Sequence, residues 1–306
     1  MNTKTIISAA LMMLLGAVLC SGQTYPSSFS TNIIRPTADE LRLDVEFLAD
    51  TLVRGRGTGT RGAVETSFYV ERSFRASGLR TSVQSFAYGN GNVGHNVMAE
   101  LVCDRTSNDW VVVCACYDGL GEIQDHVYPG ADSNASGLAV LLALSRRLRY
   151  SGKNILFVAL DAHNARMAGA QALKDFLIPS GGVAEKRVKL LVNLDTMGTR
   201  LAPPDRAYPD YLIALGGLGY ANSLRSANPS RSMQLYFDYY GSHSFTDMFY
   251  KKVSDQAPFL AAGVRCVMVP SVITAHTNKV SDTAETLDYE LLATRAELVR
   301  RWLMIL

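Results

Sequence analysis

The chain has 306 residues, of which 48% are hydrophobic and 19% charged, so one large α/β domain can bury a sizeable core without a second domain. The 30 lysine and arginine residues and the 28 aspartate and glutamate residues give a formal net charge of +2, and the basic residues form no run. This composition and spacing exclude a nucleic-acid-binding surface built on a basic patch.

Residues 1–23 have the pattern of a signal peptide. Lys4 supplies the positive end, Ile6–Leu19 the apolar stretch and Cys20 the start of a small-residue cleavage region. The apolar stretch is too short to span a bilayer. We therefore expect residues 24–306 to form a single exported domain, periplasmic or extracellular. Lipid anchoring at Cys20 is the alternative, which the bulky leucine before that cysteine disfavours.

Four cysteines lie beyond this segment: Cys103, Cys114, Cys116 and Cys266. Export permits disulfides, but all four cysteines lie in apolar, strand-like surroundings. Buried free thiols that act as small hydrophobic residues are the simpler interpretation. Cys114 and Cys116 are two positions apart on one predicted strand, so they face the same side and cannot easily pair with each other.

Apolar residues at helical spacing predict a helix over Thr37–Leu52, with Thr37 as its cap, and a second helix over Ala63–Ala76 that ends before Gly78. Two exposed loops are expected, at residues 201–208 and 228–234. Further strands are predicted at His95–Cys103, Trp110–Cys116, Asn154–Leu160, Val188–Leu194, Tyr211–Leu215 and Val264–Pro270, and further helices at Ser136–Tyr150, Arg166–Phe176 and Glu285–Leu306.

Strands that alternate with helices predict a largely parallel sheet with helices on both faces. In such sheets, ligand sites form beyond the carboxyl ends of the strands. Four sequence motifs fall at these places: YPGADSNASG at Tyr128–Gly137, FVALDA at Phe157–Ala162, VNLDTMG at Val192–Gly198 and AHTNKVSDT at Ala275–Thr283.

In order and spacing these motifs resemble the zinc-dependent aminopeptidase family, metallopeptidase family 28, which also includes glutaminyl-peptide cyclase-like members. The string RGTGT at Arg56–Thr60 is similar to the family's opening segment, and the resemblance extends from about Pro36 to the C terminus. It implies an α/β fold, a three-layer α/β/α sandwich with a mixed, mostly parallel sheet of about eight strands.

In the resembled family, a carboxylate bridges two zinc ions, other histidine and carboxylate ligands complete each ion, and a further carboxylate takes a proton from the metal-bound water. The resemblance places these functions at six positions of this chain. The metal-ligand positions hold Cys116, Ser133, Asn164, Asp195 and His276, and the general-base position holds His163.

Only Asp195 and His276 keep residue types that the family uses at these positions. Ser133, at the bridging position, offers a neutral hydroxyl, and the side-chain amide of Asn164 is a poor zinc ligand. Too little negative charge therefore remains to hold two dications. We expect no stable pair of zinc ions and no cofactor.

Four further residues complete the candidate site. Asp118 and Asp132 correspond to positions beside the family's ligands, although Asp132, like Asn134, is also a suitable cap for the helix that follows. Asp255 and Phe259 lie in the run SDQAPF, which helps to shape the substrate cleft in the resembled family. The Pro-Phe part of that run is equally suited to a turn packed on the core.

Two alternatives would preserve a reaction. In the first, a single zinc ion binds to Cys116, His163, Asp195 and His276, a set with the composition of a tetrahedral zinc site. In the second, Ser133 or Cys116 is a metal-free nucleophile with His163 as its base, although no nucleophile elbow is visible in the sequence.

The resemblance therefore leads to two expected functions. The first is an exported pseudo-aminopeptidase that keeps a cleft for a peptide, sugar or protein ligand but does not hydrolyse it. The second is an active zinc metalloexopeptidase that releases N-terminal residues through an altered metal site, with His163 as base and Asp195 and His276 as ligands.

Overall fold

The computed structural model describes residues 35–89, 91–180, 184–200, 208, 210–228, 232–239 and 241–306. The predicted signal peptide at residues 1–23, Cys20 and most of the expected loop at 201–208 lie outside this description. Among the described residues, no helix is both long enough and apolar enough to cross a membrane.

A mixed sheet of six strands, in the order β1-β2-β6-β3-β7-β10, forms the centre of the described chain. Strands β6, β3, β7 and β10 are parallel to one another, whereas β2 is antiparallel to both β1 and β6. The strands are β1 (Arg80–Tyr88), β2 (Asn92–Leu101), β3 (Asp109–Cys116), β6 (Asn154–Leu160), β7 (Arg187–Asp195) and β10 (Cys266–Pro270).

Two small strand pairs accompany this sheet. Strands β8 (Asp210–Ile213) and β9 (Met233–Tyr236) are parallel, and a bridge between Leu215 and Met268 links the end of β8 to β10. Strands β4 (Gly121–Ile123) and β5 (His126–Tyr128) are antiparallel. The main sheet and its attached pair agree with the mostly parallel sheet that the resemblance implies.

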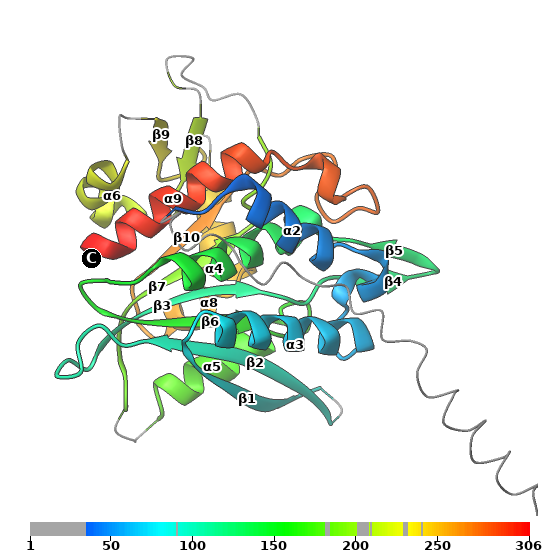
Figure 1. The fold of residues 1–306 in the computed structure, drawn as a ribbon, viewed down its shortest axis with the longest axis horizontal. Coiled ribbons are helices and arrows are strands. Elements are labelled where there is room, and N and C mark those ends of the chain that lie inside the picture. Colours follow the sequence, from blue (N-terminus) through cyan, green and yellow to red (C-terminus); the bar gives the residue numbers. More distant parts are fainter. Residues whose placement is uncertain are drawn as a thin grey trace, which may run out of the picture. The chain divides into compact units, whose positions relative to one another are not determined.

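Helices cover both faces of the sheet. Helices α3 and α4 pack on one face, with α2 and α9 against α4, and α5 packs on the other face with α8 beside it. Figure 1 shows α3 and α4 in front of the strands of the sheet. The helices are α2 (Ala38–Leu48), α3 (Arg61–Ala76), α4 (Ser136–Arg147), α5 (Ala168–Leu177), α6 (Ala221–Ala227), α7 (His243–Met248), α8 (Ala257–Ala261) and α9 (Tyr289–Ile305). The three-layer α/β/α sandwich is confirmed.

Alternate residues of β3 enter different cores, because successive side chains of a strand point to opposite faces. Val111 and Val113 join the core below α3 and α4, whereas Val112, Cys114 and Cys116 join the core below α5. Cys114 and Cys116 therefore face the same side, as predicted. All four described cysteines are free thiols.

The predicted elements agree best where they are buried. Strand β6 has the predicted bounds, and the Thr37 side chain caps α2 by accepting from the backbone N–H of Glu40 at 3.3 Å. The prediction of a loop at 228–234 is wrong at its end. Strand β9 begins at Met233, whose side chain lies in the core. Strand β1 was not predicted, because it is an edge strand whose side chains are half-buried or exposed.

Candidate functional site

The candidate site lies where the four parallel strands end. Strand β3 ends at Cys116, which pairs in register with Leu160 at the end of β6. Strand β7 ends at Asp195, which pairs with Pro270 at the end of β10. The topology therefore brings residues from distant parts of the chain to one edge of the sheet, where ligand sites form in folds of this kind.

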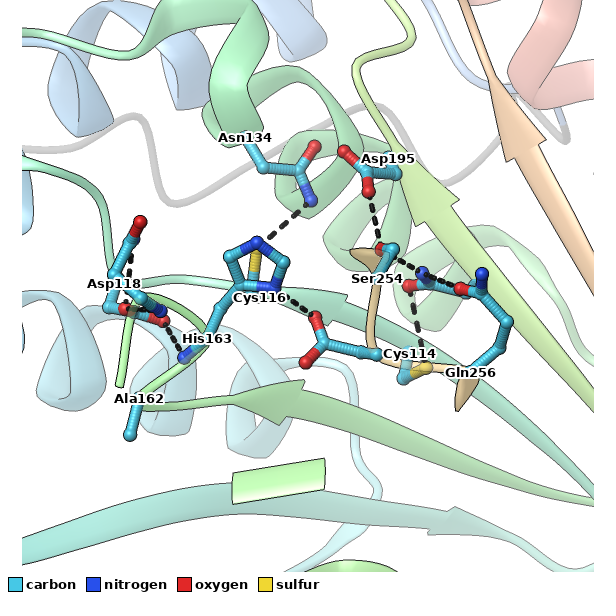
Figure 2. A network of polar contacts seen from close by, with 12 residues as sticks. Cys114, Cys116, Asp118, Asn134, Ala162, His163, Asp195, Ser254 and Gln256 are labelled. Atoms are coloured by element: carbon cyan, nitrogen blue, oxygen red, sulfur yellow. Dashed lines mark hydrogen bonds and ion pairs between the residues drawn. The ribbon is translucent and has the colours of Figure 1, made fainter. Parts of the chain in front are cut away.

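At this edge, Cys116, His163 and Asp255 form a compact group. One potential ligand atom from each residue lies within 4.8 Å of the other two. The Nδ1 atom of His163 is 2.9 Å from Oδ2 of Asp255, and Figure 2 shows the His163 imidazole beside Cys116. Cys116 is 5% exposed and Asp255 1% exposed, whereas the His163 side chain is 24% exposed, so the group meets solvent mainly at the imidazole.

The imidazole of His163 is held in its charged form. Burial lowers the pKa of His163. The carboxylates of Asp255, Asp195 and Asp118 raise it by more than burial lowers it, so the net pKa is about 10. At neutral pH the Nδ1–H group therefore donates to Asp255. A base must accept a proton, and an imidazolium has no site that can accept one.

The thiol of Cys116 is held in its neutral form. Burial raises the pKa of this thiol well above its usual value, and the nearby carboxylates of Asp255, Asp118 and Asp195 raise it further. The Asn134 amide donates to Sγ at 3.6 Å, which opposes this shift. A protonated, buried thiol is a poor nucleophile. This environment disfavours the metal-free dyad.

Asp118 positions the loop that carries His163. Its Oδ1 accepts from the backbone N–H of His163 at 2.9 Å, and its Oδ2 accepts from the backbone N–H of Asn164 at 3.1 Å and from the Thr58 hydroxyl at 2.7 Å. The side-chain amide of Asn164 also donates to Oδ2, at 3.2 Å. Asn164 therefore serves to hold the loop, and its amide is directed at Asp118.

Asp195 and His276, the two positions that keep the family's residue types, are not members of the compact group, although the Asp195 carboxylate is near enough to act electrostatically on His163. Oδ2 of Asp195 accepts from the Ser254 hydroxyl at 2.6 Å, and burial raises the pKa of Asp195. His276 is exposed, and its Nδ1 lies 3.0 Å from Oγ of Ser281. The structure does not assemble the predicted four-residue zinc set. Among the described residues, the third member of the group with Cys116 and His163 is Asp255.

Asp132 and Asn134 have different structural tasks. Oδ1 of Asp132 accepts from the Gly198 N–H at 2.7 Å and its Oδ2 from the Thr199 hydroxyl at 2.7 Å, so it ties the motif to the loop after β7. Oδ1 of Asn134 accepts from the Gly137 N–H at 3.2 Å in the first turn of α4. The capping interpretation therefore fits Asn134, whereas Asp132 mainly joins two loops.

Arg56 fixes the loops on either side of this edge. Its fully buried guanidinium donates to the backbone carbonyls of Tyr117 at 3.0 Å, Pro129 at 2.8 Å and Gly130 at 2.9 Å, and also to that of Leu48. Burial lowers the pKa of Arg56 to about 10, so it stays charged at neutral pH. This is a structural role for the first residue of the RGTGT string.

The run SDQAPF divides into two parts with different roles. Asp255 joins the compact group, and its second carboxylate oxygen, Oδ1, is buried without a hydrogen-bond partner among the described residues. Phe259 is fully buried in the core below α5, so the expected packing on the core is found, but the segment is helix α8 and not a turn. The sequence singled out Asp255 but gave no reason to join it to His163.

The donor atoms at this edge do not fit a pair of zinc ions. The bridging position carries the neutral hydroxyl of Ser133, the amide of Asn164 is engaged with Asp118, and His276 is exposed on a separate loop. Paired zinc ions need a bridging carboxylate and about three protein ligands each. We derive no hydrolytic step through such a pair.

Comparison with known proteins supports the fold and the family resemblance. Residues 96–303 match the family model described as Peptidase family M28. The alkaline phosphatase isozyme conversion protein of Escherichia coli strain K12 is 26% identical over 168 residues, which cover 48% of this chain and 48% of that protein. The chain therefore matches about half of the length of this curated relative.

Solved structures share the fold at low sequence identity. The zinc aminopeptidase BSAP from Bacillus subtilis is 15% identical, with a TM-score of 0.68 over 87% of this chain and 94% of that chain. The aminopeptidase from Aneurinibacillus sp. strain AM-1 is 15% identical, with a TM-score of 0.69 over 88% and 93%. The glutaminyl cyclase from Fimbriiglobus ruber is 17% identical, with a TM-score of 0.70 over 90% and 97%. These likenesses confirm the fold.

Proposed function

This chain belongs to peptidase family M28, and we propose that it is a pseudo-peptidase, a member that binds a ligand in its cleft without hydrolysing it. The supporting observation is the state of His163. The residue at the expected general-base position donates its Nδ1–H to the buried carboxylate of Asp255, and its pKa is raised to about 10. The chain thus has a cation where the reaction needs a proton acceptor.

The cleft keeps features that suit a ligand. A shallow hollow beside Asn164 is lined by Gly57, Thr58, Gly119, Gly121 and Glu122, whose backbone and hydroxyl groups can hydrogen bond to a polar molecule. At the neighbouring sheet edge, the three carboxylates of Asp118, Asp195 and Asp255 outnumber the two cations, His163 and Arg56. This excess of negative charge favours a ligand with a positive group, such as the free amino terminus of a peptide.

The alternative, an active metalloexopeptidase, makes different demands on the same residues. It needs His163 as a free base, whereas His163 is paired with Asp255. It also needs His276 as a metal ligand, whereas the exposed His276 shares a hydrogen bond with Ser281. These contacts favour the binding function over hydrolysis.

An activity assay separates the two functions. The mature chain is saturated with zinc, desalted and incubated with peptides that carry different N-terminal residues. The proposal predicts that no N-terminal residue is released beyond the background of a Cys116→Ala, His163→Ala double variant. Release that the double variant lacks and that a chelator abolishes would establish the metalloexopeptidase instead.

A binding assay tests the ligand class. Calorimetric titration with a short peptide should show binding that weakens about tenfold or more when the same peptide is N-acetylated, because the positive charge is lost. Equal affinity for both peptides would contradict the proposed role of the carboxylates.

The proposal places this function in an exported protein. Its support is the charged, apolar and small-residue order of residues 1–23. Expression of the full chain with its own N terminus, followed by mass measurement of the mature product, tests this point. The expected product lacks the first 23 residues or starts at a lipid-modified Cys20, and a cytoplasmic product of full length would contradict export.

A further inference from the structure

The compact group at the sheet edge contains three kinds of donor that borderline dications prefer. Cys116 offers a sulfur atom, His163 an imidazole nitrogen and Asp255 a carboxylate oxygen, all within 4.8 Å of one another. Tetrahedral zinc, with bonds of about 2.0–2.3 Å, requires donor atoms about 3.3–3.6 Å apart. Because the donor atoms lie within 4.8 Å of one another, each separation needs to shorten by at most about 1.5 Å to reach that spacing.

The buried carboxylate of Asp255 gives an independent sign of a ligand. Its Oδ1 atom has no hydrogen-bond partner among the described residues, although Asp255 is only 1% exposed. A buried oxygen without a hydrogen-bond partner is costly, so native proteins keep few of them. A bound cation would satisfy this oxygen.

We propose that Cys116, His163 and Asp255 together bind one borderline dication of the zinc type. This site goes beyond the proposed ligand-binding function and differs from the predicted four-residue set. Asp255 is not one of the six positions to which the family resemblance assigns the two ions and the base. The single ion replaces the expectation that the chain holds no cofactor. Three protein ligands leave one position for water or for a donor atom of a bound ligand.

The charges of the three ligands match that of the ion. When bound, the Cys116 thiolate and the Asp255 carboxylate carry two negative charges, which balance the two positive charges of the ion, and the His163 imidazole is neutral. This balance removes a large part of the usual cost of burying an ion.

Two neighbours are placed to support the bound state. The Asn134 amide, 3.6 Å from Sγ of Cys116, is directed to donate more strongly to a thiolate than to a thiol. Asp118 holds the backbone of His163 and so limits the movement of the ring. Such outer contacts orient metal ligands and adjust their affinity.

Cobalt(II) is a suitable probe, because thiolate-bound cobalt absorbs light by charge transfer from sulfur and tetrahedral cobalt has intense visible bands. The full mature chain, freed of metal with a chelator, is titrated with cobalt and then with zinc. The expected result is one cobalt ion per chain with a thiolate charge-transfer band, and loss of that band when zinc displaces cobalt.

Variants assign the ligands. Cys116→Ser should abolish the charge-transfer band, and Asp255→Asn should weaken cobalt binding about 100-fold or more, since loss of even an outer contact costs 10–100-fold. The matched control is Cys114→Ser, two positions earlier on the same face, where the thiol contacts Asn193 and the band should persist. His276→Ala should also leave the band unchanged.

The wild-type spectrum alone decides the proposal if a variant does not fold. Absence of a thiolate band in the wild-type chain overturns it, as does a band that survives Cys116→Ser or one that is lost in His276→Ala. These results concern metal binding only. Peptide hydrolysis, by contrast, would overturn the proposed function, so the two failures can be told apart.

Discussion

Nδ1 of His163 lies 2.9 Å from Oδ2 of Asp255, a residue 92 positions later in the chain. This contact turns the expected general-base position into one half of a partly buried ion pair. It also brings an acidic residue beside Cys116 that the family resemblance placed in the substrate cleft. The pH dependence of the chain's stability follows from this pair.

The His163–Asp255 pair stabilises the metal-free chain, and this stabilisation is lost at alkaline pH. The pKa of His163 is raised from 6.5 to about 10, so the folded state holds a proton that the unfolded state releases. The stabilisation is complete below about pH 6.5 and is lost as the pH rises through about 10, at up to about 1.4 kcal/mol per pH unit. Urea unfolding in the presence of a chelator, from pH 6 to 10.5, measures this slope.

His163→Gln is the matched variant for that experiment, because glutamine keeps a polar side chain but does not titrate. Its free energy of unfolding should depend less on pH over the same interval. Parallel curves for the wild type and the variant would show that His163 is not charged in the folded chain.

Asp118 is expected to stabilise the loop after β6. Asp118→Ala removes the acceptor for the backbone N–H groups of His163 and Asn164, which lie 2.9 and 3.1 Å away. We expect a loss of about 2–4 kcal/mol in the free energy of unfolding, because two N–H groups lose a charged acceptor. Chemical denaturation measures the loss.

Thr58→Val is the matched variant against which the loss in Asp118→Ala is compared. It removes only one hydroxyl donor to Asp118, at 2.7 Å. Its cost should be about 1–2 kcal/mol. A larger cost for Thr58→Val than for Asp118→Ala would contradict the central place of Asp118 in this loop.

Gly137 is required where α4 passes close to β7. A β-carbon at this position would lie 2.4 Å from Oδ1 of Asn134 and 2.6 Å from the backbone oxygen of Leu194. Gly137→Ala should therefore destabilise the chain by about 1–3 kcal/mol and displace Asn134 from Cys116. The matched control is Gly219→Ala, where a β-carbon would meet no heavy atom within 4 Å. Equal melting temperatures for the two variants would be inconsistent with this packing.

The sequence predicts well where the strands that carry the site end, but it predicts poorly which side chains meet there. Strands β3 and β6 were located because both of their faces are buried and their residues are continuously apolar. The position of the site followed from the ends of these strands. Edge strand β1 carries serine, threonine and glutamine on half-exposed positions, so it lacks this signal.

Two site residues show why sequence spacing is insufficient. Asp255 reaches His163 only through the tertiary fold, and no periodicity connects positions that far apart. His276 keeps the family's residue type, but turn contacts within its own loop, such as the Lys279 N–H to its carbonyl at 2.9 Å, accompany its exposed position. Residue identity gave the candidate ligands, whereas geometry decided which of them meet.

Restoration of the family's residue types should rebuild the paired-metal centre if the fold places these positions correctly. A quadruple variant, Cys116→His, Ser133→Asp, His163→Glu and Asn164→Glu, supplies the bridging carboxylate, the base and the missing ligands. Elemental analysis after zinc loading and desalting should give about two zinc ions per chain. A folded quadruple variant that holds no zinc would show that these positions do not form one site.

The most direct test of the pseudo-peptidase function is the zinc content of the wild-type chain, measured together with its aminopeptidase activity after zinc loading and desalting. We predict at most one zinc ion per chain and no release of N-terminal residues. Two zinc ions per chain, lost on chelation together with aminopeptidase activity, would contradict the account.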